Sequence, residues 1–563
     1  MSTHKRIDVI CIAAVILTIV LTVLLMNGKT FDIMPVMNEE AGSAHFTAND
    51  MNADWDISSA TSIVLSDSGS KINGTGAYVH DGNVYIVYAG CYVLTGELTN
   101  GSVIIDADKS DKIWVLLDGA AIHCGDGAAI RVEQADNVFL TLADGTESTV
   151  SSGEQYSAEN IASGVDGVIY SRDDLTINGT GALYVSTEYD HGIVCNDDLM
   201  ITGGNITISA VQDGIHANDS VRIRNAAISI SAGDDGISVS NDDETAFLYV
   251  ESGSISIPAC YEGLEAVDIT IAGGTIDILA TDDGINASGN GDNSAIRIAG
   301  GDITIINPTG RDADGLDSNG SIYVEGGKVF ISVLGSGGNC ALDYGSENGG
   351  ECVVSGGTVI ACGGSMMAEG FDAGSPQGFL IYNMTAEAGA EISLQDSVGG
   401  ELLSEEIPCS FSSIVLSTPE LKVGDACTIV VDGIQEQVMI DNSSVSGSGP
   451  AGMFGGDGMR NGRNHPPQSN DMGDEDKPGM KAGGRAEDAF PVSGMMEPPN
   501  GENRPDRQGM RENGGRQLEP DPGQEISSSS LSADTWVLLG ISVFVLLIGL
   551  FIAMKTSFYR PDQ

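Results

Sequence analysis

Basic residues are scarce in this chain. Its 563 residues include 25 Lys and Arg against 80 Asp and Glu, which gives a formal net charge of −55 at pH 7. A surface of this sign repels the phosphates of nucleic acid and attracts cations, so the composition argues against a nucleic-acid partner. Aromatic residues are also few, at 5% of the chain. Broad aromatic platforms are therefore not expected.

The cysteines lack the spacing of a zinc site. None of the ten belongs to a CxxC pair, and such pairs are the usual signature of zinc. Cys11 lies in an apolar run near the N-terminus and nine cysteines lie beyond it, so at least one of the nine is left without an intramolecular disulfide partner. Because cysteine packs as a small apolar residue, we expect these thiols to be buried in strands.

What the sequence does contain is a repeat between residues 166 and 343. Each unit has an acidic residue, a glycine and an apolar residue, and an alternating strand of the type Gly-Gly-x-Ile-x-Ile follows within the same unit. The glycines Gly192, Gly214 and Gly236 are 22 residues apart. The acidic units are Asp166-Gly167, Asp213-Gly214, Asp234-Asp235-Gly236, Glu262-Gly263, Asp282-Asp283-Gly284 and Asp314-Gly315, and Asp190-His191-Gly192 is a variant with an inserted His.

A period of 20–30 residues with short strands and no helical periodicity predicts a solenoid, because one repeat cannot bury its own apolar face. We expect an all-β fold, a right-handed parallel β-helix with strands about 4.8 Å apart, so that equivalent residues form columns along its axis. The rhythm changes at both ends of the repeat region. The predicted parts are a β-rich N-terminal cap with the first coils at 60–150, the β-helix domain at 151–375 and a short C-terminal β meander at 376–440.

Two apolar runs, residues 7–26 and 535–554, are each long enough to span a bilayer. Lys5 and Arg6 precede the first and Lys555 follows the second, so the positive-inside rule places both termini in the cytoplasm. A signal peptide is the alternative for the first run, which is long for one and has no small-x-small cleavage site close behind it. We therefore expect a cell-membrane protein with two transmembrane helices and an extracellular β-helix. The remaining segments are a cytoplasmic N-terminus at 1–6, a linker at 27–59, a disordered Gly/Pro/Met-rich tether at 441–533 and a cytoplasmic tail at 555–563.

Three runs of motifs give the chain a family resemblance. They are the segment 171–185 (SRDDLTINGTGALYV), the segment 196–201 (NDDLMI) and the Asp-Asp-Gly-Ile units. Over residues 60–435 the chain resembles the bacterial carbohydrate-binding domain-containing proteins. That resemblance implies a polysaccharide-lyase-like parallel β-helix, bound calcium, and binding of cellulose or acidic sugars at the cell surface.

The column of acids is itself suited to calcium, which takes six to eight oxygen ligands. Stacked carboxylates would raise one another's pKa, and a divalent ion between them removes that cost. The alternative is a solvated acidic edge that discourages strand pairing. The candidate calcium ligands are Asp213, Asp234, Asp235, Glu262, Glu265, Asp282, Asp283, Asp312, Asp314 and Asp317.

Catalysis and sugar binding compete as interpretations. Paired carboxylates suit a glycoside hydrolase, and Arg311 is the one attractive base for a polysaccharide lyase, although a salt bridge to Asp312 or Asp314 is the simpler role for it. The acidic pairs recur, as scaffold residues do and as a single catalytic pair does not. The candidate sugar-binding residues are Tyr189, His216, Tyr261 and Tyr323.

The sequence therefore predicts a calcium-dependent protein of the cell surface that binds a polysaccharide, with Ca²⁺ able to bridge protein and sugar carboxylates. It is more consistent with a binding protein than with an enzyme. A polysaccharide lyase or glycoside hydrolase, and a structural surface stalk, are the alternatives.

Overall fold

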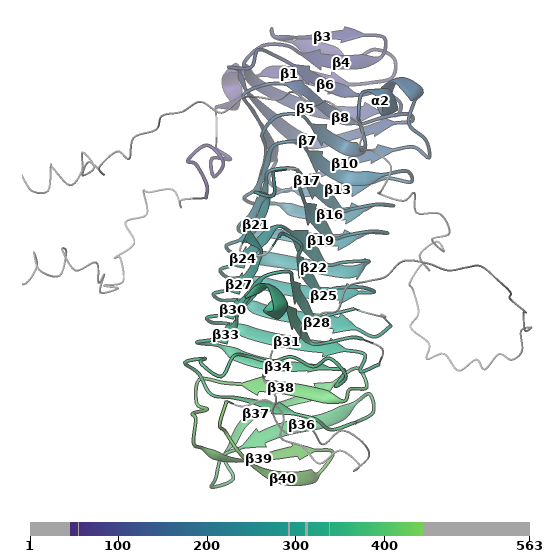
Figure 1. Ribbon diagram of the computed structural model, residues 1–563. Coiled ribbons are helices and arrows are strands. Elements are labelled where there is room, and N and C mark those ends of the chain that lie inside the picture. The colour runs from purple at the N-terminus through teal and green to yellow at the C-terminus, as the bar shows by residue number, and fades with distance from the viewer. Residues whose placement is uncertain are drawn as a thin grey trace, which may run out of the picture. The chain divides into compact units, whose positions relative to one another are not determined.

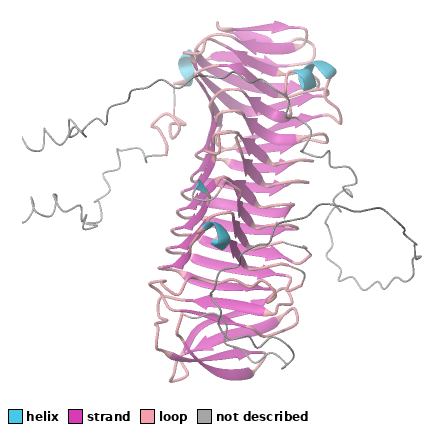
Figure 2. Ribbon diagram, viewed as in Figure 1, coloured by secondary structure: helices cyan, strands magenta, loops and turns pink. Residues whose placement is uncertain are grey.

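The computed structural model describes residues 45–442, except Trp55, Asp242, Gly291, Asp292, 310–312 and Gly337. Within this part the protein is almost entirely strand (Figures 1 and 2). The helical elements are short and include η1 (Ile57–Ser59), α2 (Ala158–Ala162) and η3 (Ser346–Asn348). No helix in the described ranges is long and apolar enough to cross a membrane. The spans predicted at 7–26 and 535–554 lie outside the described residues, as does the predicted tether from 443 onward.

The N-terminal strands begin with two antiparallel hairpins and then turn into parallel coils. β1 pairs antiparallel with β2 and β3 with β4, whereas β4 pairs parallel with β6 and β6 with β8. The strands of this region are β1 (Thr61–Leu65), β2 (Lys71–Asn73), β3 (Ala77–His80), β4 (Asn83–Ile86), β5 (Gly90–Leu98), β6 (Val103–Asp106), β7 (Lys112–Cys124), β8 (Ile130–Gln134), β9 (Asn137–Leu142) and β10 (Glu147–Ser152).

The central coils contribute one strand to each of three faces, and every strand pairs parallel with its equivalents in the coils above and below. The first face is the 12-stranded sheet. Its strands are β3, β4, β6, β8, β11 (Gly167–Ser171), β14 (His191–Cys195), β17 (Ile215–Ala217), β20 (Ile237–Val239), β23 (Leu264–Ala266), β26 (Ile285–Ala287), β29 (Leu316–Ser318) and β32 (Leu342–Tyr344).

The second and third faces are joined into one 24-stranded sheet through the long strands β5 and β7, which run from one face onto the other. Beyond β9, the second face contains β12 (Leu175–Gly179), β15 (Asp198–Ile201), β18 (Ser220–Ile223), β21 (Phe247–Val250), β24 (Asp268–Ile271), β27 (Ala295–Ile298), β30 (Ser321–Val324) and β33 (Cys352–Val354). Beyond β10, the third face contains β13 (Ala182–Ser186), β16 (Asn205–Ser209), β19 (Ala226–Ser231), β22 (Gly253–Cys260), β25 (Thr275–Ala280), β28 (Asp302–Asn307), β31 (Lys328–Val333) and β34 (Thr358–Gly363).

The prediction of an all-β parallel solenoid is confirmed, with about ten turns. Its right-handed sense stays a prediction. After β34 the pairing becomes antiparallel. β38 lies between β34 and β35, and a separate four-stranded sheet follows in the order β37-β36-β39-β40. These strands are β35 (Phe379–Tyr382), β36 (Ala390–Gln395), β37 (Glu401–Ile407), β38 (Ser413–Ser417), β39 (Ala426–Val431) and β40 (Ile434–Met439).

The core is a set of aliphatic columns that run along the axis. On the first face one column is Ile193, Ile215, Ile237, Leu264, Ile285 and Leu316, and none of these side chains is exposed. Each such side chain contributes about 1.5–3 kcal/mol through burial. The glycines of the repeat stand beside this core. A Cβ on Gly284 would lie 2.3 Å from Ile305 Cγ2 and 2.6 Å from the Gly315 carbonyl oxygen, so any larger residue would force the coils apart.

A segment from the predicted linker packs on the second face. We call residues 45–54 the strap. Phe46 and Asp50 in it are buried. The Asp50 carboxylate accepts a hydrogen bond of 2.9 Å from Thr176 Oγ1, and the His45 ring stacks on Tyr249 at 3.8 Å between centroids. The strap therefore crosses strands β12 to β21, more than 120 residues away in sequence.

Candidate functional site

In four of the repeat units the acidic residue before the glycine accepts a backbone amide of the next coil through its side chain. Asp213 Oδ1 accepts the Asp235 amide at 3.1 Å, Asp235 Oδ1 accepts the Glu262 amide at 3.3 Å, and Asp283 Oδ1 accepts the Asp314 amide at 2.7 Å. Asp314 in turn accepts the amide of Cys340. These residues form a column on the rim of the first face, which we call the acid ladder. Its recurrence thus has a structural cause, because each carboxylate satisfies a buried amide of the neighbouring coil.

A second column lies three residues further along each unit, in the middle of the first-face strands. Register places His216, Ser238, Glu265, Asn286, Asp317 and Asp343 side by side. Their side chains reach the acid ladder: Asn286 Nδ2 donates to Glu262 Oε2 at 3.0 Å, and His216 Nδ1 lies 3.0 Å from Asp213 Oδ2. The two columns therefore present their oxygen atoms to the same space.

Carboxylates of the two columns, together with Asp234 beside Asp235, form three groups. In each group one oxygen from every member lies within 4.8 Å of the others, which is close enough for one cation to contact all three. The groups are Asp213 with Asp234 and Asp235, Asp235 with Glu262 and Glu265, and Asp314 with Asp317 and Asp343.

The electrostatics of these groups disfavour a full set of negative charges. Burial, reinforced by Asp213, Glu262 and Glu265, raises the pKa of Asp235 to about 10. Burial also raises the pKa of Asp283 to about 9, of Glu262 to about 7 and of Asp317 to about 6. At neutral pH Asp235 and Asp283 therefore stay protonated unless a cation faces them.

The N-terminal end of the acid ladder has a different chemistry, with two histidines. Their rings lie 5.3 Å apart between centroids, and Nδ1 of His191 is 3.3 Å from Asp213 Oδ2. Burial opposes the charged form of Asp213, but the hydrogen bonds from His191 and His216 outweigh it and hold its pKa below the usual range. His216, a candidate sugar-binding residue, lies half-buried against Asp213.

The predicted calcium ligands therefore mostly lie together. Asp213, Asp234, Asp235, Glu262, Glu265, Asp314 and Asp317 belong to the three groups. Asp282 and Asp283 lie between the second and third groups, and the charge of Asp282 contributes to the raised pKa of both Glu262 and Asp283. Asp312 and the alternative catalytic residue Arg311 lie outside the described residues.

The predicted sugar-binding tyrosines lie on different faces. Tyr261 belongs to the rim of the first face, where its amide donates to the Asp234 carbonyl at 2.7 Å. Tyr189 stacks on Tyr156 at 4.9 Å, and Tyr323 lies on the second face with the Arg297 guanidinium 4.4 Å from its ring centroid. All three are half-buried. They form no common platform.

Sequence reasoning missed two parts of this surface. Asp343 completes the third group, but its unit reads Cys340-Ala341-Leu342 and lacks the acidic residue and glycine of the repeat. The in-register pairing of Asp317 with Asp343 reveals it. A further acidic corner follows the first-face strands, where burial and neighbouring carboxylates raise the pKa of Asp174 and of Asp197 to about 6. The repeated Asn-Asp pairs at 196–197 and 218–219 were its signal in the sequence.

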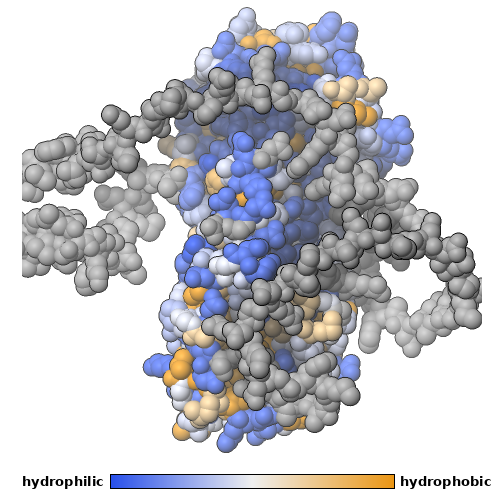
Figure 3. All heavy atoms as spheres, viewed as in Figure 1, coloured by the Kyte–Doolittle hydropathy of each residue, from blue (hydrophilic) through white to orange (hydrophobic). Residues whose placement is uncertain are grey.

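Hydrophilic side chains predominate over the coils in Figure 3, and apolar ones gather toward the C-terminal strands. The fold and the site define a class of protein, a parallel β-solenoid with acidic groups along one face. The model of the carbohydrate-binding domain-containing protein family matches residues 80–337 and 246–374. Together the two matches span residues 80–374, more than half of the chain, and the chain belongs to this family.

Two known proteins are similar to this chain. A carbohydrate-binding domain-containing protein of Acetivibrio thermocellus is 36% identical over 139 residues, which are 24% of this chain and 49% of the relative. The chain thus matches about half the length of that relative. A solved structure, described as the polysaccharide lyase-like protein from C. thermocellum in a gadolinium derivative, is 28% identical and covers 47% of this chain and 96% of its own, with a TM-score of 0.38.

Proposed function

We propose that this protein binds a polysaccharide at the cell surface through calcium ions held on the first face of its solenoid. The observation that carries the proposal is the row of three carboxylate groups, each with oxygen atoms within 4.8 Å of one another. Membership of a carbohydrate-binding domain family supports the choice of ligand.

The chemistry of the row favours a hard divalent cation. Calcium accepts six to eight oxygen ligands at flexible geometry, and the first two groups share Asp235 so that neighbouring ions would have a common ligand. Carboxyls with pKa values raised to about 10, 9 and 7 are costly to ionise without a counter-charge. A bound Ca²⁺ supplies that charge, and its remaining coordination positions are open to sugar hydroxyl or carboxylate oxygens.

The ion pairs of the arginines favour a binding function over catalysis. All five arginines in the described ranges form ion pairs with acidic residues, as Arg222 does with Asp198 at 2.9 Å and Arg297 with Glu325 at 2.7 Å. A lyase requires a basic group that can take a proton from the sugar, and these five side chains are engaged, whereas Arg311, the alternative base, lies outside the described residues. The acid ladder recurs along the coils, whereas a catalytic site needs one unique constellation.

The test is a pull-down of the full chain on cellulose and on immobilised polygalacturonate, with Ca²⁺ or with EGTA. A Ca²⁺ concentration of ~2 mM saturates weak extracellular sites. We expect binding to polygalacturonate that calcium promotes and EGTA abolishes, and no shortening of either polysaccharide. The double variant Asp314→Asn, Asp317→Asn should weaken it, whereas Asp396→Asn in the C-terminal strands, away from the ladder, should not. Unsaturated sugar ends in the supernatant would instead establish a lyase.

Localisation has its own experiment. The proposed topology, with both termini in the cytoplasm and the solenoid outside, predicts that protease added to intact cells removes an epitope inserted after Gly399, an exposed turn between β36 and β37. An epitope at the C-terminus should survive. Loss of both, or survival of both, contradicts the topology.

A further inference from the structure

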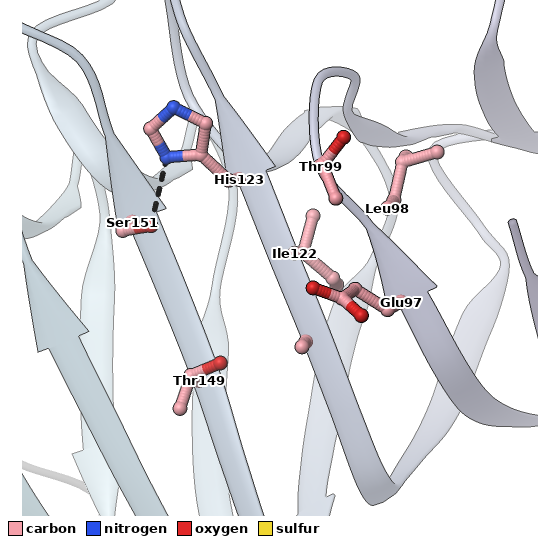
Figure 4. Close-up of a pocket in the computed structure, with 8 residues that line it drawn as sticks. Glu97, Leu98, Thr99, Ile122, His123, Thr149 and Ser151 are labelled. Atoms are coloured by element: carbon pink, nitrogen blue, oxygen red, sulfur yellow. Dashed lines mark hydrogen bonds between the residues drawn. The ribbon is translucent and has the colours of Figure 1, made fainter. Parts of the chain in front are cut away.

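A shallow cavity lies at the N-terminal end of the third face, on strands β5, β7 and β10. The cavity has a volume of about 320 Å³, and Ala121 is one of the residues that line it. Glu97, Thr99, His123, Thr149 and Ser151 lie around it in Figure 4. The inward side chains Leu98 and Ile122 beneath it belong to the core. This place is separate from the acidic groups, which lie on the first face.

The register of the strands explains the hollow. Glu97 pairs with Ala121, Ala121 with Thr149, and Thr149 with Tyr184 of β13, so these four side chains form one row across neighbouring strands. Ala121 is a methyl group between two longer side chains, and its place in the row is therefore empty. With strands about 4.8 Å apart, the row extends about 14 Å, which is the length of a few sugar units.

A second row provides directed polar groups. His123 pairs with Ser151, and His123 Nδ1 lies 2.9 Å from Ser151 Oγ. Thr99 is fixed from the other side, because its hydroxyl donates to Asp67 Oδ2 at 2.6 Å. The imidazole is thus oriented through one nitrogen, and Nε2 has no hydrogen-bond partner among the described residues. Hydroxyl, imidazole and carboxylate groups on one floor can exchange hydrogen bonds with sugar hydroxyls.

An exposed aromatic ring stands at the end of the row. Tyr184 is 42% exposed, more than any other tyrosine of the solenoid coils after β5. Its ring offers an apolar plane with a polar edge, the kind of surface on which a pyranose ring packs. The face continues beyond it with small hydroxyl residues, Thr207 and Ser209 on β16 and Ser231 on β19, all of them exposed.

We propose that this cavity, with Tyr184 as its platform, is a second carbohydrate site that takes an uncharged glycan chain without calcium. The charge of the lining selects the ligand class. Among the described residues that line it, Glu97 is the only charged one, and none is lysine or arginine. A uronate would meet a carboxylate with no compensating cation, whereas neutral sugar hydroxyls can donate to Glu97.

The experiment measures binding of the full chain to uncharged β-linked hexasaccharides of glucose, xylose and mannose by calorimetry in EGTA, with hexagalacturonate as the charged comparison. We expect at least one uncharged hexasaccharide to bind and hexagalacturonate not to bind. Ala121→Gln fills the hollow and should weaken affinity about tenfold or more, and Tyr184→Ala, which removes an exposed ring, should have a similar effect. Thr275→Ala, at an exposed threonine of β25 on the same face but away from the row, is the matched control and should stay within about twofold.

The proposal fails if no uncharged hexasaccharide binds in EGTA, if Ala121→Gln and Tyr184→Ala both bind as wild type does, or if hexagalacturonate competes. Its failure is distinguishable from that of the calcium-dependent function. The pull-down on polygalacturonate with calcium tests the first face alone and should be unchanged in Ala121→Gln.

Discussion

Each carboxyl group of the acid ladder has to meet two demands, one of hydrogen bonding and one of charge. In Asp235 and in Asp283 one oxygen accepts an amide of the next coil, and the same carboxyl group has other carboxylates as neighbours. The first demand is structural and is met in the protonated or the ionised form. The second is met only when the charge is balanced, because burial raises the pKa of both groups.

These shifts predict a stability that depends on pH in the absence of metal. The folded pKa values, about 10 for Asp235 and about 9 for Asp283, exceed the value of about 3.9 in an unfolded chain. The protonated folded form is thus favoured at low pH, and stability is lost as the pH rises from about 4 to about 9, by at most about 1.4 kcal/mol per pH unit for each group.

Urea unfolding of the full chain in EGTA between pH 5 and 9 measures this loss. Calcium should flatten the profile, since it replaces the proton, and Asp235→Asn should flatten it without calcium because the amide carries no charge. Equal slopes for wild type and Asp235→Asn in EGTA would contradict the assignment.

Close packing at the ladder glycines gives a second prediction. Gly284→Ala places a Cβ against Ile305 and the Gly315 carbonyl, and we expect a loss of about 1–3 kcal/mol in the free energy of unfolding. Gly374→Ala is the control, because nothing lies within 4 Å of a Cβ there. Denaturant midpoints of the two variants provide the comparison, and equal midpoints would contradict the tight contact.

At the scale of elements, the strap is held by a few specific contacts. Asp50 Oδ1 accepts from Thr176, its other oxygen accepts the Thr47 amide at 2.7 Å, and the Arg224 guanidinium lies 5.8 Å from the centroid of the Phe46 ring. We expect Asp50→Ala to leave Thr176 buried without this partner and to release the strap.

Limited proteolysis with chymotrypsin tests the release. Cleavage at Phe46, which is 3% exposed, should be faster in Asp50→Ala by about tenfold, the effect of some 1.4 kcal/mol. Asp54→Ala is the control, because Asp54 is exposed and its amide bonds within the strap, to Asn52 Oδ1 at 3.2 Å. Similar cleavage rates in both variants would show that the strap does not depend on Asp50.

The elements differ in how far the sequence predicts them. The coils repeat, so one unit such as Asp282-Asp283-Gly284 predicts its neighbours, and the positions of the acidic groups follow from the period. The strap and the cavity do not repeat. The Asp50–Thr176 contact joins residues 126 positions apart, and the hollow at Ala121 appears only when the register of three strands is known. The candidate sugar-binding tyrosines were likewise predicted from their residue type alone, and the strand register places Tyr323 on a different face from Tyr261.

At the scale of the whole molecule, the formal charge of −55 means that cations can stabilise the fold in two ways, by general screening and by specific binding. Any salt screens the general repulsion, whereas only an ion that fits the carboxylate groups is bound by them. We expect the melting temperature of the full chain to rise by several degrees in about 5 mM CaCl₂, because a ligand of the native state stabilises it by mass action. NaCl of the same ionic strength should give a smaller rise, and Asp314→Asn, Asp317→Asn should reduce only the calcium effect.

The even spacing of the coils has a consequence for what the first face can recognise. The first and third carboxylate groups are separated by several strands of a regular sheet, so the distance between them is a fixed multiple of about 4.8 Å. Ions at both places would hold one polymer at two points, and the second contact would then form at high effective concentration. Such a face discriminates between polymers by their length. Short oligosaccharides bind at one ion and exchange quickly, whereas a chain that reaches both ions is retained far more strongly than either contact alone allows.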